Sequence, residues 1–136
     1  MNEQRLELQR LVEKEEELKC LVEKLNAHFR HTEEALGEFS CATARITMKG
    51  ATEEANDPES EGPPVEIAYS LAYRKEKGGY QLVVIEDVDG EENCVLPVSS
   101  APLRQRIEAA QILPRLIRNL TVRTESLAEE IKKIVQ

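Results

Sequence analysis

Apolar residues recur at helical spacing through the first 39 residues of the chain. Two series, each spaced by multiples of seven residues, form one stripe: Leu11, Leu18, Leu25 and Phe39 in the first, and Leu8, Val22, Phe29 and Leu36 in the second. This pattern predicts an amphipathic helix over residues 1–39, about 55 Å long at 1.5 Å per residue. The acidic run at residues 13–17 interrupts the stripe, so we expect the first turns to project from the domain.

Alternating apolar and polar residues follow the helix. The apolar positions within residues 41–49 alternate with Thr, Arg and Lys: Ala42, Ala44, Ile46 and Met48. This alternation predicts a half-buried strand. Residues 50–64 contain five acidic residues, two Gly and three Pro, with no large apolar residue. They predict a long mobile loop, with an acidic recognition tail as the functional alternative.

Three more strands are predicted, over residues 65–74, 80–88 and 93–98. The tip at residues 75–79 and the Asp89-Gly90 pair are turn signals. The strands therefore form an antiparallel sheet across residues 41–98.

The third predicted strand is apolar on both faces, since Leu82 and Val84 point one way and Val83 and Ile85 the other. A strand that is covered on both sides has this pattern. We expect it at the centre of the sheet. Helices of this chain should cover one face, and the long helices or a partner subunit should cover the other.

The last segment, residues 100–136, has the strongest periodicity in the chain. Its apolar stripe follows steps of four and three residues: Leu103, Ile107, Ala110, Leu113, Ile117, Leu120, Thr124, Leu127, Ile131 and Ile134. This spacing approximates the heptad of a coiled coil. Ser99 and Ser100 offer a helix N-cap, and Pro114 is expected to kink or split the helix near Leu113. The elements together predict an α+β fold in one domain, residues 1–136: a long N-terminal helix, a four-stranded antiparallel meander and a long kinked C-terminal helix.

Charge divides unevenly between the two predicted helices. Residues 1–39 hold ten acidic and six basic residues, whereas residues 102–136 hold four acidic and seven basic residues. Helices of opposite sign are natural neighbours, within one chain or across a dimer. The net charge of −8 makes general binding to nucleic-acid phosphates unfavourable. Aromatic residues make up 4% of the chain and Trp is absent, a composition poor for base-stacking platforms.

The cysteines Cys20, Cys41 and Cys94 do not have the spacing of zinc ligands. We expect free thiols, with Cys20 and Cys94 in or near the core. The N-terminal residues lack the apolar region of a signal peptide, and no apolar run approaches the roughly 18 residues of a membrane span. These features predict a cytoplasmic protein without a membrane partner.

Two groups of side chains could carry acid–base or metal chemistry. His28, His31 and Glu34 lie near one helical face and could ligate a metal, although two surface or packing histidines are the simpler interpretation. Carboxylates gather around the end of the third strand: Glu86, Asp87, Asp89, Glu91 and Glu92. Such a cluster could bind a cation or do acid–base work, and a solvated hairpin turn is the simpler interpretation.

Arg104, Arg115 and Arg118 lie at steps compatible with one face of the C-terminal helix. Guanidinium groups suit carboxylate or phosphate contacts. Contact with the acidic first helix is the simpler interpretation, and a phosphate or nucleic-acid site is the alternative.

The sequence favours a protein–protein interaction or assembly module, a homodimer formed through its amphipathic helices, with no catalytic, cofactor or metal site. The candidate partner-binding residues lie on the C-terminal helix and the third strand: Leu113, Ile117, Leu120, Leu127, Ile131, Ile134, Val83, Ile85, Arg104, Arg115 and Arg118. A nucleic-acid-associated regulator or acidic nucleic-acid mimic is one alternative. A small metal-dependent or acid–base enzyme is the other.

Overall fold

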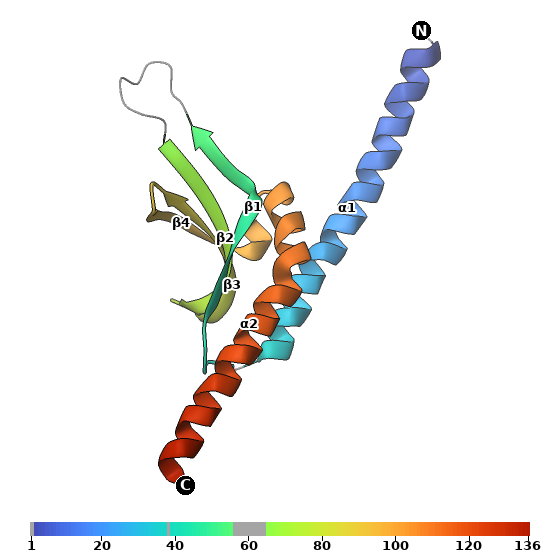
Figure 1. Ribbon diagram of the computed structural model, residues 1–136. Coiled ribbons are helices and arrows are strands. Elements are labelled where there is room, and N and C mark those ends of the chain that lie inside the picture. The colour runs from blue at the N-terminus through green and yellow to red at the C-terminus, as the bar shows by residue number, and fades with distance from the viewer. Residues whose placement is uncertain (1, 38, 56–64) are drawn as a thin grey trace.

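A computed structural model describes residues 2–37, 39–55 and 65–136, with the backbone alone for residues 49–55. The elements follow in this order: α1 (Asn2–Leu36), β1 (Ala44–Ala55), β2 (Val65–Glu76), β3 (Gly79–Val88), β4 (Glu91–Pro97), a 3-10 turn (Val98–Ser100) and α2 (Leu103–Val135). The predicted α+β arrangement is confirmed. Along the sequence the antiparallel sheet comes between the two long helices, and in space both helices lie on the same side of the sheet (Figure 1).

The sheet is a meander with the strand order β1-β2-β3-β4. Its register places Leu71 of β2 between Ile46 of β1 and Val84 of β3. The turn between β3 and β4 has positive φ at both Asp89 (50°) and Gly90 (82°). Two-residue hairpins of type I′ need positive φ at both central residues, so the turn predicted from the Asp-Gly pair is confirmed.

The strand β1 is longer than the alternation predicted. It continues to Ala55 and pairs with the start of β2, after an irregularity in register between Met48 and Glu53. Residues 50–55 therefore belong to a strand, and their assignment to a loop was wrong. Backbone hydrogen bonding to β2 does not require apolar side chains. The polar composition of residues 50–55 therefore predicted a loop although these residues pair as a strand. The rest of the predicted loop, residues 56–64, lies outside the described residues.

The main core lies between one face of the sheet and the two helices (Figure 1). Its buried members come from both layers: Phe29, Ala44, Ile46, Met48, Leu71, Tyr73, Leu82, Val84, Val98, Ala101, Ala109, Leu113, Leu116 and Leu120. The hydroxyl of Tyr73 donates a hydrogen bond to the carbonyl oxygen of Phe39 at 2.5 Å. This bond ties the segment after α1 to the middle of the sheet.

The opposite face of the sheet holds a smaller buried cluster of Ala72, Val83 and Ile85, with Val95 packed against it. Both faces of β3 are therefore buried, as its sequence predicted. The prediction that the long helices would close this second face was wrong, because the described residues of this cluster all belong to the sheet; closure by a partner subunit stays a prediction. Polar side chains reach across it: Arg45 bonds Asp87 and Ser70, and Arg74 bonds Glu92.

Both helix ends near the core differ in detail from the prediction. The first helix ends at Leu36, and Gly37 follows with φ +57°, a conformation typical of the residue after a helix. The N-cap position of α2 is Pro102, without a side-chain cap, so the predicted Ser cap was wrong. Instead the Arg106 guanidinium donates to the carbonyl oxygen of Ala101 at 2.8 Å and to Asn26 of α1 at 2.9 Å.

The second helix runs unbroken through Pro114, so the predicted split was wrong. The side chain of Pro114 is exposed. Because proline has no backbone N–H, the carbonyl oxygen four residues earlier receives no hydrogen bond from it, and water can bind this oxygen on the exposed side of the helix.

Candidate functional site

Both long helices extend beyond the core as exposed arms. In α1 all residues from 2 to 21 are exposed, and Phe29 is the buried residue of the helix. In α2 residues 121–135 are exposed apart from the half-buried Thr124. Figure 1 shows that the two arms leave the body at opposite ends, the α1 arm towards the N-terminus and the α2 arm towards the C-terminus.

An apolar row continues along the α1 arm without a covering element. Leu8, Leu11 and Leu18 are 56%, 64% and 48% exposed, and we call these three residues the α1 seam. The same row then enters the body, where Leu25 packs against the core and Phe29 is 1% exposed. The seam is therefore the outer half of a row whose inner half is already buried by the fold.

The α2 arm repeats this arrangement in the opposite direction. Leu127, Ile131 and Ile134 are 42%, 58% and 82% exposed, and we call them the α2 seam. They continue the row that contains Leu113 and Leu120, which are buried in the core. Positions spaced by four and three residues share one helical face. A helix lying along this face would therefore cover the α2 seam.

Local interactions favour helical structure in the two arms. Lys14 pairs with Glu17 at 3.0 Å and Lys19 with Glu15 at 3.4 Å, one helical turn apart. Such exposed pairs contribute only about 0.2–0.5 kcal/mol each. Basic residues Lys132 and Lys133 occupy the last turn of α2, where they interact favourably with the helix dipole. The arms consequently extend apolar side chains into solvent on a helical scaffold.

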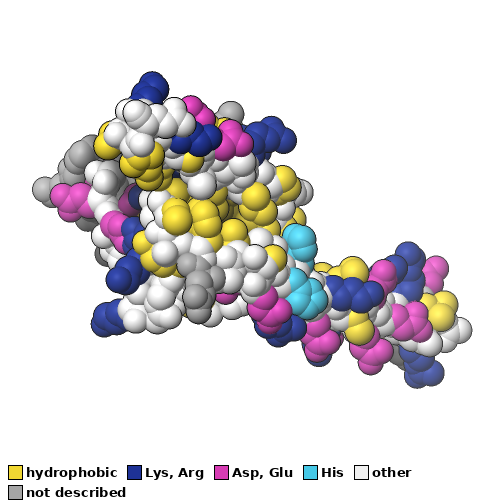
Figure 2. Space-filling view, turned by 90° about the horizontal axis from the view of Figure 1, so that it is seen from below, with side chains coloured by type: hydrophobic (Ala, Val, Ile, Leu, Met, Phe, Trp, Pro, Cys, Tyr) yellow, Lys and Arg dark blue, Asp and Glu magenta, His cyan; other side chains and the backbone are white. Residues whose placement is uncertain are grey.

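The two helices have opposite net charge. Described α1 holds nine acidic and six basic residues, and α2 holds four acidic and seven basic residues, giving −3 and +3. Figure 2 shows the α1 arm with mixed charge around its apolar side chains, and the two histidines at its root. Beside the seams the contrast is smaller: residues 2–21 of α1 hold six acidic and four basic residues, and residues 121–135 of α2 hold three of each.

An apolar groove extends the α2 seam into the body. It encloses about 230 Å³ between the end of α1 and the middle of α2. Its walls come from both helices and from Phe39 in the segment after α1: Leu36, Phe39, Ile117, Leu120, Thr121, Thr124 and Glu125. A helix lying on the α2 seam would meet this groove at its inner end.

The structure divides the residues predicted to bind a partner into two groups. Leu113, Leu120, Val83 and Ile85 lie in the chain's own core, each at most 3% exposed, so they are not part of a free surface. Those on the surface are Ile117, Leu127, Ile131, Ile134, Arg104, Arg115 and Arg118.

A polar contact between the helices is made by the Arg106 guanidinium, which donates to the Asn26 side-chain oxygen. It does not use Arg104, Arg115 or Arg118, the residues predicted to contact α1.

The α1 seam was not among the predicted site residues. Its signal was present, because Leu8, Leu11 and Leu18 belong to the same heptad stripe as Phe29. The acidic run at residues 13–17 predicted that the first turns project from the domain, and the structure places residues 2–21 outside the core. The partner-binding residues were nevertheless predicted on the C-terminal helix and the third strand alone.

The carboxylates near the end of β3 have separate structural partners. Asp87 pairs with Arg45, the side chain of Asp89 accepts a hydrogen bond from the Glu66 backbone N–H, and Glu92 pairs with Arg74. His28 and His31 are both exposed on α1. Across the described residues, no three His, Cys, Asp or Glu side chains come together as metal ligands.

Arg74 is the centre of the ion pairs over the outer face of the sheet. It donates through Nη1 to Glu92 at 3.0 Å and through Nε to Glu76 at 2.6 Å. Hydrogen bonding to Arg74 lowers the pKa of Glu92, and the Glu92 carboxylate raises the pKa of Arg74. Together with Arg45 and Arg123, Arg74 lines a hollow of about 170 Å³. The guanidinium of Arg123 donates there to the Thr43 carbonyl oxygen, so all three arginines are engaged within the chain.

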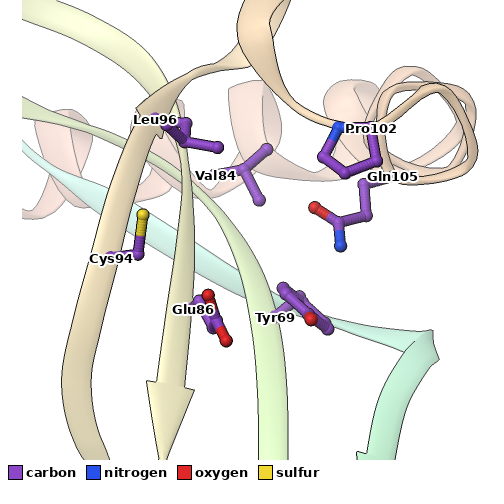
Figure 3. A pocket seen from close by; sticks show the side chains of 7 residues that line it. All are labelled: Tyr69, Val84, Glu86, Cys94, Leu96, Pro102 and Gln105. Atoms are coloured by element: carbon purple, nitrogen blue, oxygen red, sulfur yellow. The ribbon is translucent and has the colours of Figure 1, made fainter.

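A separate small pocket lies between the sheet and the start of α2 (Figure 3). It encloses about 110 Å³, with Val84, Leu96 and Pro102 towards one end and the Glu86 carboxylate towards the other. Its remaining side chains are Tyr69, Cys94 and Gln105. The lining includes a thiol but neither a histidine nor a cation to activate it.

The thiols differ in exposure from the prediction. Cys20 is exposed on the α1 arm, whereas Cys94 is half-buried and Cys41 exposed. The prediction of a core position for Cys20 was wrong, because the arm on which it lies leaves the core.

Comparison with models of known protein families, with curated proteins and with solved structures finds no match for this chain. Among the described residues, no helix combines the length and hydrophobicity that crossing a membrane requires.

Proposed function

We propose that this protein is an assembly module whose binding elements are the seams of its two helical arms. The observation that supports this most directly is that each apolar row passes from the core onto an exposed arm. Leu25 and Phe29 are packed, while Leu11 and Leu18 of the same row are 64% and 48% exposed. Contiguous exposed apolar surface of this kind marks interaction sites. An amphipathic row is commonly recognised by a complementary helix or groove.

Self-association is the form of assembly that we propose first. Each chain carries two unfilled apolar rows of opposite helix charge, so a second copy offers matching surface without any other partner. We also propose a reducing, cytoplasmic location, which suits the exposed thiols of Cys20 and Cys41.

Sedimentation velocity over a micromolar concentration range tests the proposal. The wild-type chain should form a dimer or larger species, and the double change of Leu127 and Ile131 to Asp should weaken this association. Both residues are exposed, so the variant should keep its circular-dichroism spectrum and melting temperature at low concentration. A chain that remains monomeric at high concentration would rule out self-association.

A further inference from the structure

The placement of the arms restricts how two copies can cover both seams. In Figure 1, α1 and α2 run in the same general direction, and their free arms lie at opposite ends of the body. A two-fold axis perpendicular to that direction exchanges the two ends. It brings the α1 arm of each copy beside the α2 arm of the other, running antiparallel. Two equal arm pairs form at once, and neither copy keeps a free seam.

Charge favours this exchange over pairing of identical arms. Residues 2–21 of α1 hold six acidic and four basic residues. Glu15 lies in the row of the α1 seam, seven residues after Leu8. Two parallel α1 arms in register would set this carboxylate against its own copy, which is unfavourable at a coiled-coil contact. Opposite the α2 arm, whose residues 121–135 hold three acidic and three basic residues, the α1 arm meets a helix without net negative charge.

We propose that the α1 seam of one copy docks antiparallel on the α2 seam of a second copy, and reciprocally, in a closed two-fold dimer. This inference rests on the proposed assembly function and identifies its partner and pairing. The apolar groove beside Ile117 and Leu120 continues the α2 seam towards the body. The inner end of the incoming α1 arm, where it joins its own body, would lie close to this groove.

Mixing two variants tests the pairing directly. In the first variant Leu11 and Leu18 of the α1 seam become Asp. In the second, Leu127 and Ile131 of the α2 seam become Asp. All four positions are exposed and outside the core. A control variant carries Gln9→Asp and Ser126→Asp, which add the same charge at exposed arm positions beside the seams.

Reciprocal pairing gives a distinctive result. Each seam variant alone damages both arm pairs of its dimer, so each should sediment as a monomer where the wild type is dimeric. In an equimolar mixture, one arm pair carries all four changes and the other is fully wild type. The mixture should therefore recover a heterodimer, detectable by sedimentation or by energy transfer between differently labelled chains. The control variant should dimerise like the wild type.

Other outcomes would overturn the pairing in recognisable ways. If the wild type dimerises and only one seam variant loses its dimer, identical arms pair and the exchange is wrong while the assembly function stands. If both variants are monomeric and their mixture is too, the exchange is again wrong. A wild type that grows into a concentration-dependent series of larger species would show open head-to-tail pairing instead. A monomeric wild type would overturn both the pairing and the proposed self-association.

Discussion

The two halves of α1 carry the same apolar row in different surroundings. Leu25 and Phe29 of the inner half pack on the sheet and α2, while Leu8, Leu11 and Leu18 of the outer half face solvent. The second helix shows the same contrast between buried Leu120 and exposed Ile131. Periodicity therefore shows that a helical face favours burial, but it does not show whether the same chain supplies the cover.

The largest difference should appear between Phe29 and Leu11. Replacing Phe29 with Ala removes a ring that is 1% exposed and should cost about 3–5 kcal/mol of unfolding free energy. Leu11→Ala should change the unfolding free energy of the monomer by about 0.5 kcal/mol or less. Urea denaturation at concentrations below association measures both. Equal losses would mean that the outer half of α1 is packed in the folded monomer.

A smaller version of the same contrast should hold along α2. Leu116 is fully buried, so Leu116→Ala should cost about 2–5 kcal/mol. Ile131 is 58% exposed, and Ile131→Ala should leave monomer stability almost unchanged while weakening association. Comparing thermal melts at low and high protein concentration separates these effects. A concentration-independent loss at Ile131 would place it in the monomer's core.

The outer face of the sheet is a third kind of environment, neither core nor solvent-exposed helix, in which polar side chains lie beside an apolar cluster. Arg74→Ala should cost about 1–2 kcal/mol, because hydrogen bonds to Glu92 and Glu76 are lost. Arg104→Ala is the matched control, since this arginine is exposed on α2, and it should be neutral. If chemical denaturation gives both variants wild-type stability, the Arg74 contacts do not stabilise the sheet.

The smallest expected effect is a change in pH dependence. Because the pKa of Glu92 is lowered in the folded state, its contribution is present above the unfolded value of 4.5 and disappears as pH falls through the folded value. Glu92→Gln should therefore flatten the acid side of the stability curve slightly, and the two curves should converge at the lowest pH. Melting temperatures between about pH 7 and pH 3 measure this. Parallel curves would contradict the lowered pKa.

Much of the fold follows from local sequence patterns. The heptad rows predicted both helices, and the Asp89-Gly90 pair predicted the hairpin turn at its observed place. The two-sided burial of β3 was readable from Val83 and Ile85. These features depend on neighbours along the chain or on one strand, where spacing carries the information.

The errors concern features that depend on distant residues. The continuation of β1 to Ala55 is set by backbone pairing with β2, which an acidic composition conceals. The closure of the outer sheet face depends on Arg45 and Arg74 reaching residues on other strands. Cys20 was placed in the core because its neighbours are apolar, although it lies where the helix has left the body. The two seams could not be identified from periodicity alone, because it does not show where the core ends along each helix.

One contact between α1 and the sheet links the position of the helix to the hydrogen bonding of a central strand. The last residue of β4, Pro97, pairs with Val83, so Leu82 lies one residue beyond the paired part of that ladder. The carboxylate of Glu33 accepts the Leu82 backbone N–H at 3.2 Å. Leu82 is 0% exposed, and a buried backbone N–H without a partner is costly. A side chain of α1 thus completes the hydrogen bonding of the sheet, so loosening this helix would also leave a buried strand donor unsatisfied.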